Sequence, residues 1–87
     1  MKQVDNYEVL TDVCPLQIEG KIGNTYFHLR LRNYRLWVGF FSDSDLNECF
    51  WSYKWNVWTE NTMDISKAIG IVEYTYALMD LMAGEEE

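Results

Sequence analysis

Apolar and polar residues alternate along residues 16–41 in a pattern that predicts an antiparallel β-meander. Gly23-Asn24 interrupts the alternation with a dipeptide suited to a two-residue hairpin loop, because glycine accepts a positive φ without a Cβ clash. With this loop, Ile18 faces Leu29, and the neighbouring pairs are apolar on one side and polar on the other. The pattern therefore predicts both the first hairpin and its register.

A second reversal is predicted at Asn33-Tyr34. A two-residue loop there places Arg30 beside Trp37 on the polar side of the sheet. Tyrosine is a poor residue for a turn that requires two positive φ values, so a longer loop is the alternative.

Residues 49–58 resume the alternation and predict a fourth strand, which follows a polar loop at residues 42–48. Trp51, Tyr53 and Trp55 share one side of this strand, so its buried side is expected to be aromatic.

The first 15 residues are compatible with a short edge strand, a helical turn or an ordered arm containing Tyr7, Val9 and Val13. Pro15 is expected to end this segment, because proline biases the preceding Cys14 toward an extended backbone.

A helix is predicted to begin near Asn61 or Thr62, either of which can act as N-cap, with Asp64 in the first turn. Gly84 is expected to cap its end before a solvated tail, residues 85–87. The predicted sheet-facing residues are Ile65, Ala68, Ile69, Val72, Tyr76 and Met79. Further apolar residues around Ile71, Leu78 and Leu81 are expected outside that face.

These elements predict an α+β fold, a four-stranded antiparallel β-sheet (meander) with a C-terminal α-helix packed on one face. The chain of 87 residues shows no repeat or linker, so residues 1–87 are expected to form a single domain. One sheet and one helix do not bury all of the apolar side chains. The excess predicts coverage by the N-terminal arm, by a second copy or by a partner.

The composition makes this an acidic chain, with a net charge of −7 and a pI of about 4.5. This charge disfavours direct binding to nucleic acid or to an anionic membrane. No stretch approaches a transmembrane helix in length, and the first residues lack a signal peptide's apolar run. Cys14 and Cys49 lack a metal-ligand spacing, so reduced thiols in a cytoplasm are expected.

The candidate catalytic and metal-binding residues do not form a recognisable site. His28 is the only histidine and has no nucleophile in a known sequence context. Residues 43–47 resemble the start of a calcium-binding EF-hand loop, but Glu48 and Lys54 occupy the positions that require glycine and glutamate. The sequence therefore predicts a protein that is not an enzyme and that uses no cofactor or metal.

Arginine and aromatic residues concentrate between residues 30 and 37, where Arg35 adds a third arginine. Such residues are used for protein hot spots and for nucleic-acid bases. The alternative is that these residues make contacts only within the chain, with Arg30 stacked on Trp37 and the other arginines paired with the chain's own carboxylates. The acidic loop at residues 43–48 is a second candidate contact. The predicted partner-binding residues are Arg30, Arg32, Tyr34, Trp37, Asp43, Asp45 and Glu48.

The segment from residue 15 to residue 40, PLQIEGKIGNTYFHLRLRNYRLWVGF, resembles small uncharacterised proteins encoded by phages and prophages. In type, the chain is also similar to anti-CRISPR and other anti-defence proteins. The resemblance implies a stoichiometric inhibitor that binds a host protein, such as a nucleic-acid-binding effector whose groove it blocks. The alternative is a structural or accessory phage protein that acts as a homodimer without an inhibitory role.

Overall fold

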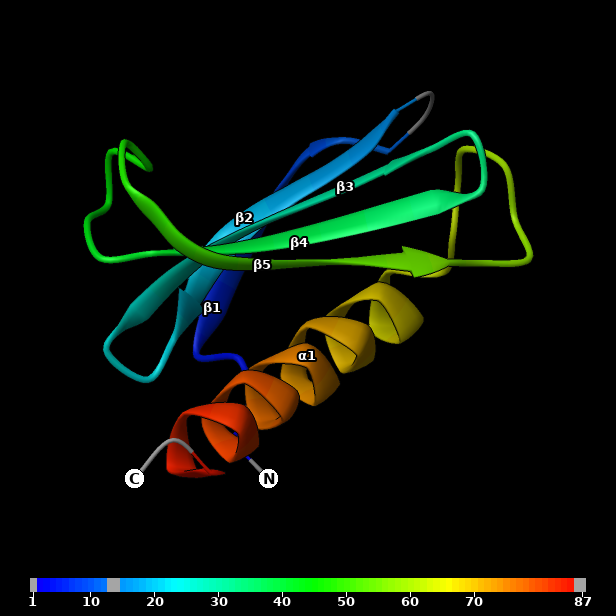
Figure 1. The fold of residues 1–87 in the computed structure, drawn as a ribbon. Helices are drawn as coiled ribbons and strands as arrows, with labels where there is room; N and C mark the ends of the chain where they lie inside the picture. Colours follow the sequence, from blue (N-terminus) through cyan, green and yellow to red (C-terminus); the bar gives the residue numbers. More distant parts are fainter. Residues whose placement is uncertain (1, 13–14, 86–87) are drawn as a thin grey trace.

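The computed structural model describes residues 2–12 and 15–85 as one antiparallel sheet with one helix across a single face (Figure 1). The elements are β1 (Asn6–Thr11), β2 (Leu16–Ile22), β3 (Thr25–Arg32), β4 (Arg35–Phe41), β5 (Cys49–Asn56) and α1 (Ile65–Glu85). The strands lie in the order β1-β2-β3-β4-β5, so each strand pairs with its neighbour in sequence. The predicted α+β class, with an antiparallel sheet and a C-terminal helix, is confirmed.

The predicted number of strands is wrong, because β1 adds a fifth strand at the edge beside β2. Tyr7 pairs with Gly20 and Val9 with Ile18 before the register shifts. Gly20 permits this close pairing, since a Cβ there would collide with the backbone of Asn6 and Tyr7. The alternating pattern of β1 is too short to distinguish a strand from an arm. The other residues named for this segment, Val13 and Cys14, lie outside the described residues.

Both hairpins have the predicted two-residue loops and registers. Gly23 has a φ of 61° in the first, whereas Asn33 and Tyr34 have φ values of 52° and 64° in the second. A left-handed tyrosine costs about 1–2 kcal/mol. Two backbone bonds hold it in place: Tyr34 N donates to Glu60 O at 3.0 Å, and Val57 N donates to Tyr34 O at 2.9 Å. The segment after β5 therefore offsets the strain of this turn.

The fourth predicted strand is β5, and its aromatic side faces α1. Trp55 Nε1 donates to Thr75 Oγ1 at 2.9 Å, and Thr75 Oγ1 donates to Ile71 O at 2.6 Å. This chain of bonds satisfies the buried threonine in the middle of the helix. Phe50 is an extra residue at a bulge in the β4–β5 pairing, which leaves its ring exposed.

The helix begins later than predicted, and Asp64 is its N-cap. Asp64 Oδ1 accepts hydrogen bonds from Ser66 N at 2.8 Å and from Ser66 Oγ at 2.6 Å. Asn61 instead supports the second hairpin, since its Oδ1 accepts from Asn33 N at 3.4 Å. The expectation that Asn61 or Thr62 caps the helix is therefore wrong.

At its other end, α1 continues through Gly84 to Glu85, so the predicted glycine cap is also wrong. The remaining tail residues, 86 and 87, lie outside the described part of the chain.

The hydrophobic core lies between α1 and the sheet face that carries the apolar residues of β2, β3 and β4. Its fully buried residues are Leu16, Ile18, Ile22, Phe27, Leu29, Leu31, Leu36, Val38, Phe40, Ala68 and Val72. Ile69 packs against this cluster, as do the other predicted helix positions Ile65, Tyr76 and Met79. The predicted phase of the helix is confirmed.

The N-terminal arm covers part of the remaining apolar surface. Val4 packs against the core, and its N–H donates to Glu73 Oε2 on α1 at 2.8 Å. Asp5 joins the arm to the first hairpin, because its Oδ2 accepts from Gly23 N at 2.8 Å.

Candidate functional site

The open face, defined as the sheet face turned away from α1, is not covered by another layer of secondary structure (Figure 1). Side chains alternate across a sheet, so the polar partners in the observed register all project from this face. Gln17, Arg30, Trp37 and Lys54 form one cross-strand row. This arrangement brings together residues that are distant in the sequence.

Most of the positive charge of this acidic chain lies on the open face. Five of the seven lysine and arginine residues are there, leaving Lys2 and Lys67 elsewhere. The five are Lys21, Arg30, Arg32, Arg35 and Lys54. The net charge therefore does not describe the local field of this surface.

Trp37 lies flat along β4 over Gly39, where an added Cβ would collide with the indole ring. The indole is flanked by His28, with ring centroids 6.1 Å apart, and by Phe41, at 6.4 Å in an edge-on arrangement. The side chain is half-buried, so part of the ring remains available to a ligand. Gly39 and the two rings hold this indole in position before anything binds.

Four cationic residues lie in the cross-strand row of Trp37 and in the next row, whereas the indole itself leans the other way, over Gly39. Arg30 and Lys54 are its cross-strand neighbours, and Arg32 and Arg35 pair with each other in the next row, about 6–7 Å farther along the strands. The set Arg30, Arg32, Arg35, Trp37 and Lys54 is called the Trp37 platform below. All four cationic residues are exposed.

The internal alternative for the arginines is not observed. Among the described residues, the one ion pair within 4 Å joins His28 Nδ1 to Glu19 Oε2 at 3.4 Å. In the same part of the chain, the cation–π contacts are Lys21 over Tyr26 and Lys67 over Trp58. The arginines of the platform therefore have neither carboxylate nor aromatic partners among these residues.

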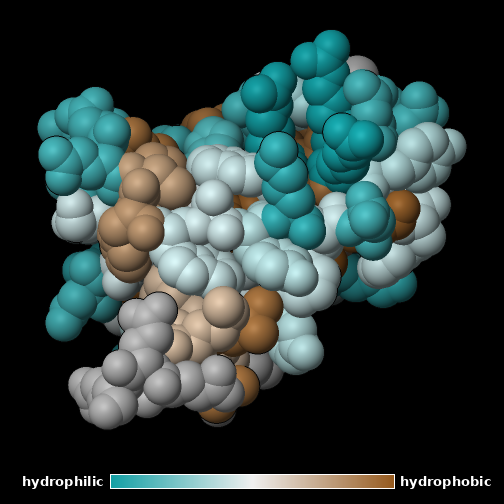
Figure 2. All heavy atoms as spheres, viewed as in Figure 1, coloured by the Kyte–Doolittle hydropathy of each residue, from teal (hydrophilic) through white to brown (hydrophobic). Residues whose placement is uncertain are grey.

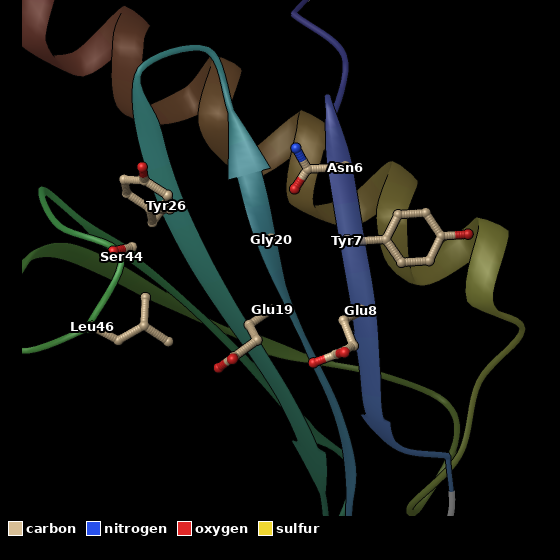
Figure 3. A pocket seen from close by; sticks show the side chains of 8 residues that line it. All are labelled: Asn6, Tyr7, Glu8, Glu19, Gly20, Tyr26, Ser44 and Leu46. Carbon is tan, nitrogen blue, oxygen red and sulfur yellow. The ribbon is translucent and has the colours of Figure 1, made fainter.

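Carboxylates occupy another region of the open face. Glu8 and Glu19 are direct cross-strand neighbours on β1 and β2. They line a cavity of about 310 Å³ together with Tyr26 on β3 and Ser44 and Leu46 of the β4–β5 loop. Figure 3 shows both glutamates on the same side of the sheet, with α1 behind it. The open face is therefore divided between a basic part and an acidic part.

The structure separates the predicted partner-binding residues into two groups at opposite ends of β4 (Figure 1). Arg30, Arg32, Tyr34 and Trp37 belong to the end with the β3–β4 turn, and Asp43, Asp45 and Glu48 to the β4–β5 loop. Figure 2 shows hydrophilic side chains gathered at these two ends. The six residues from Trp37 to Asp43 span roughly 20 Å if extended. A single compact site cannot include both groups.

Within the acidic loop, Asp43 differs from its neighbours. Its Oδ1 accepts from Asn47 N at 3.3 Å, and its carbonyl accepts from Leu46 N at 3.2 Å. The Asp43 carboxylate therefore stabilises the loop, whereas Asp45 and Glu48 are exposed.

Sequence reasoning did not assign Lys54 or Gly39 to the site. Lys54 reaches Trp37 only through the β4–β5 register, which depends on the bulge at Phe50. A glycine in the middle of an apolar strand was the available signal for Gly39, since it often marks a close approach.

Apolar side chains are also exposed on α1, on β5 and in the segment that follows β5. Of the helix residues expected outside the core, Leu81 is 62% exposed and Leu78 is half-buried. The expectation is wrong for Ile71, which packs against the core cluster. The other large exposed apolar residues in these three segments are Phe50, Tyr53, Trp58, Tyr74 and Met82.

The described residues contain no group of three or more His, Cys, Asp or Glu side chains arranged to hold a metal ion. Cys49 is an exposed free thiol on β5. No helix within residues 2–12 and 15–85 is long and apolar enough to cross a membrane.

Comparisons of the sequence and the structure match no protein-family model, no curated protein and no solved structure.

Proposed function

We propose that this protein is a non-catalytic binding protein that holds a partner protein against its open face. The observation that carries the proposal is the Trp37 platform, in which an indole on an uncovered sheet lies beside four exposed cations that have no ion-pair partner among the described residues. Tryptophan and arginine are the residues most often found at interface hot spots.

Preorganisation supports this proposal. The Trp37 ring is held between Gly39, His28 and Phe41. A side chain that is already fixed loses little conformational entropy on binding. The cations are attached to paired strands, so their backbone positions are fixed as well.

The more specific proposal is a phage-type inhibitor that acts by stoichiometric contact with a host protein, such as an effector with a nucleic-acid-binding groove. It rests on the resemblance of residues 15–40 to phage-encoded proteins. In that setting Asp45 and Glu48 form a second, acidic contact that suits a basic groove.

The test is recovery of a partner from a bacterial lysate by tagged wild-type protein and by two tryptophan variants. Trp37→Ala should lose the partner, whereas the matched control Trp58→Ala should keep it. Trp58 is 68% exposed and contacts Lys67 rather than the open face. Circular dichroism must show both variants folded. Equal recovery by both variants would contradict the proposed role of the open face.

A second candidate function is the structural homodimer, which the exposed apolar residues of α1 favour. Tyr74 is 57% exposed and Leu81 is 62% exposed on this helix. Light scattering at micromolar concentration should show a dimer that Leu81→Glu dissociates. A strict monomer would rule out this candidate.

A further inference from the structure

We infer that the Trp37 platform binds a short acidic segment of the partner protein, with an apolar or aromatic side chain resting on the indole and carboxylates toward the four cations. This inference rests on the proposed function, since it names the chemistry of what the open face holds. It differs from the acidic-contact proposal because here the basic part of the chain makes the contact.

The first step is charge complementarity. Arg30, Arg32, Arg35 and Lys54 have no carboxylate within 4 Å among the described residues. Arginine binds a carboxylate through two parallel N–H···O bonds, which provides orientation as well as energy. A partner segment with carboxylates satisfies donors that the chain itself leaves to solvent.

The second step is spacing. The Trp37 row and the Arg32–Arg35 row lie two residues apart on the same strands, about 6–7 Å. An extended peptide presents side chains to one side at the same interval. Because the Trp37 ring lies over Gly39, away from the Arg32–Arg35 row, a peptide of the type acid–any–acid–any–apolar that rests its apolar residue on the ring brings its carboxylates near the Arg30–Lys54 row and near the arginine row.

The third step limits the length of the ligand. Glu8 and Glu19 lie on the same face beyond His28, and Asp45 and Glu48 lie past the far end of β4. A long polyanion that continued past the platform would meet these carboxylates. Glu19 lies in the row next to the Trp37 row, and Asp43 lies at most roughly 20 Å from Trp37 along the chain. These distances favour a short acidic peptide over a nucleic-acid strand.

The experiment measures fluorescence anisotropy with the full chain and three labelled probes. The probes are a nine-residue peptide with glutamates around a central phenylalanine, the same peptide with lysines, and a ten-nucleotide oligouridine. The acidic peptide should bind most tightly, and its affinity should fall as salt rises from 50 to 300 mM. Stronger binding of either other probe, or no binding of the acidic peptide, would overturn the inference.

Charge-neutral variants assign the binding to the platform. The triple variant Arg30→Gln/Arg35→Gln/Lys54→Gln should bind the acidic peptide roughly tenfold or more weakly than the wild type. The control variant Lys67→Gln should bind it with unchanged affinity. All of the substituted side chains are exposed, and melting curves check that the fold is retained. Equal affinity of the triple variant and the wild type would contradict the inference.

The lysate partner separates this inference from the proposed function. If Trp37→Ala loses the partner and the triple variant keeps it, the open face is the contact but its ligand is not acidic. If both variants keep the partner, the proposed function fails as well.

Discussion

The same strands form both faces of this sheet, but the two faces differ in the residues that they carry and in how these residues pack. On the face toward α1, every fully buried position of β2, β3 and β4 is apolar. On the open face, an indole lies over a glycine, and the neighbouring rows carry cations that have no ion-pair partner in the described chain. Burial explains the first face completely. The second also carries four exposed cations that the packing of the fold leaves in solvent, and these residues are the basis of the proposed binding role.

The largest loss of stability should come from truncating a side chain on the sheet face that α1 covers. Phe40→Ala removes a buried ring that contacts Trp51 and Tyr76, and it should lower the free energy of unfolding by about 3–5 kcal/mol. Phe50→Ala is the matched control, because this ring is 55% exposed at the bulge. The control should change stability by about 0.5 kcal/mol or less. Urea denaturation measures both, and similar losses would contradict the assignment of the faces.

An intermediate effect is expected for glycine substitutions on the two sides of the molecule. Gly39→Ala should displace the Trp37 ring, lower stability by about 1–3 kcal/mol and weaken partner binding. Gly70→Ala on α1 has no atom within 4 Å of its added Cβ and should raise stability by about 0.5–1 kcal/mol. Thermal melting and tryptophan fluorescence follow the two variants. A change of melting temperature with the same sign in both variants would show that Trp37 is not held against Gly39.

A smaller effect is expected at Tyr34 in the β3–β4 turn, where one substitution should change stability and partner binding in opposite directions. Tyr34 has a φ of 64°, and asparagine adopts this conformation more readily. Tyr34→Asn should therefore raise stability by about 1 kcal/mol or less while it weakens the partner interaction. Denaturation and the lysate capture described above measure the two quantities. A variant that is less stable would indicate that the tyrosine side chain contributes more to packing than the strain costs.

The smallest effect concerns Asp64, which belongs to neither face. Hydrogen bonds from the Ser66 hydroxyl and backbone N–H lower the pKa of the Asp64 carboxyl below its usual value. A lowered pKa in the folded state contributes stability above the unfolded pKa of about 3.9, and this stability is lost as pH falls through the folded value. Asp64→Asn keeps a capping oxygen but cannot ionise. The melting temperature of this variant should therefore depend less on pH below pH 5. An unchanged acid dependence would exclude this carboxylate as the cause.

The sequence predicted the central hairpins because each depends on local turn chemistry. The register that places Arg30 beside Trp37 follows from a two-residue loop at Asn33-Tyr34, and it is confirmed. Lys54 joins the same row through a bulge after a seven-residue loop, which no local rule determines. The first strand was not assigned because two alternating apolar residues, Tyr7 and Val9, do not distinguish a strand from an arm.

The separation of charge along β4 also could not be predicted from composition. The total of −7 suggested an acidic contact surface. The pairing of strands placed five of the seven basic residues on one face. The register of the strands determines which charged residues become neighbours across the sheet, whereas composition carries no information about position.

The meander order has a consequence for synthesis of the chain. Each strand pairs with the strand made just before it, so the hairpins can close, in roughly 1–10 μs each, while later residues are still being added. The helix of 21 residues comes after all five strands. At 5–20 residues per second, its synthesis takes roughly 1–4 s. For that interval the sheet cannot bury its apolar face against α1, so the core of the domain closes only after the last residues of the helix have been added.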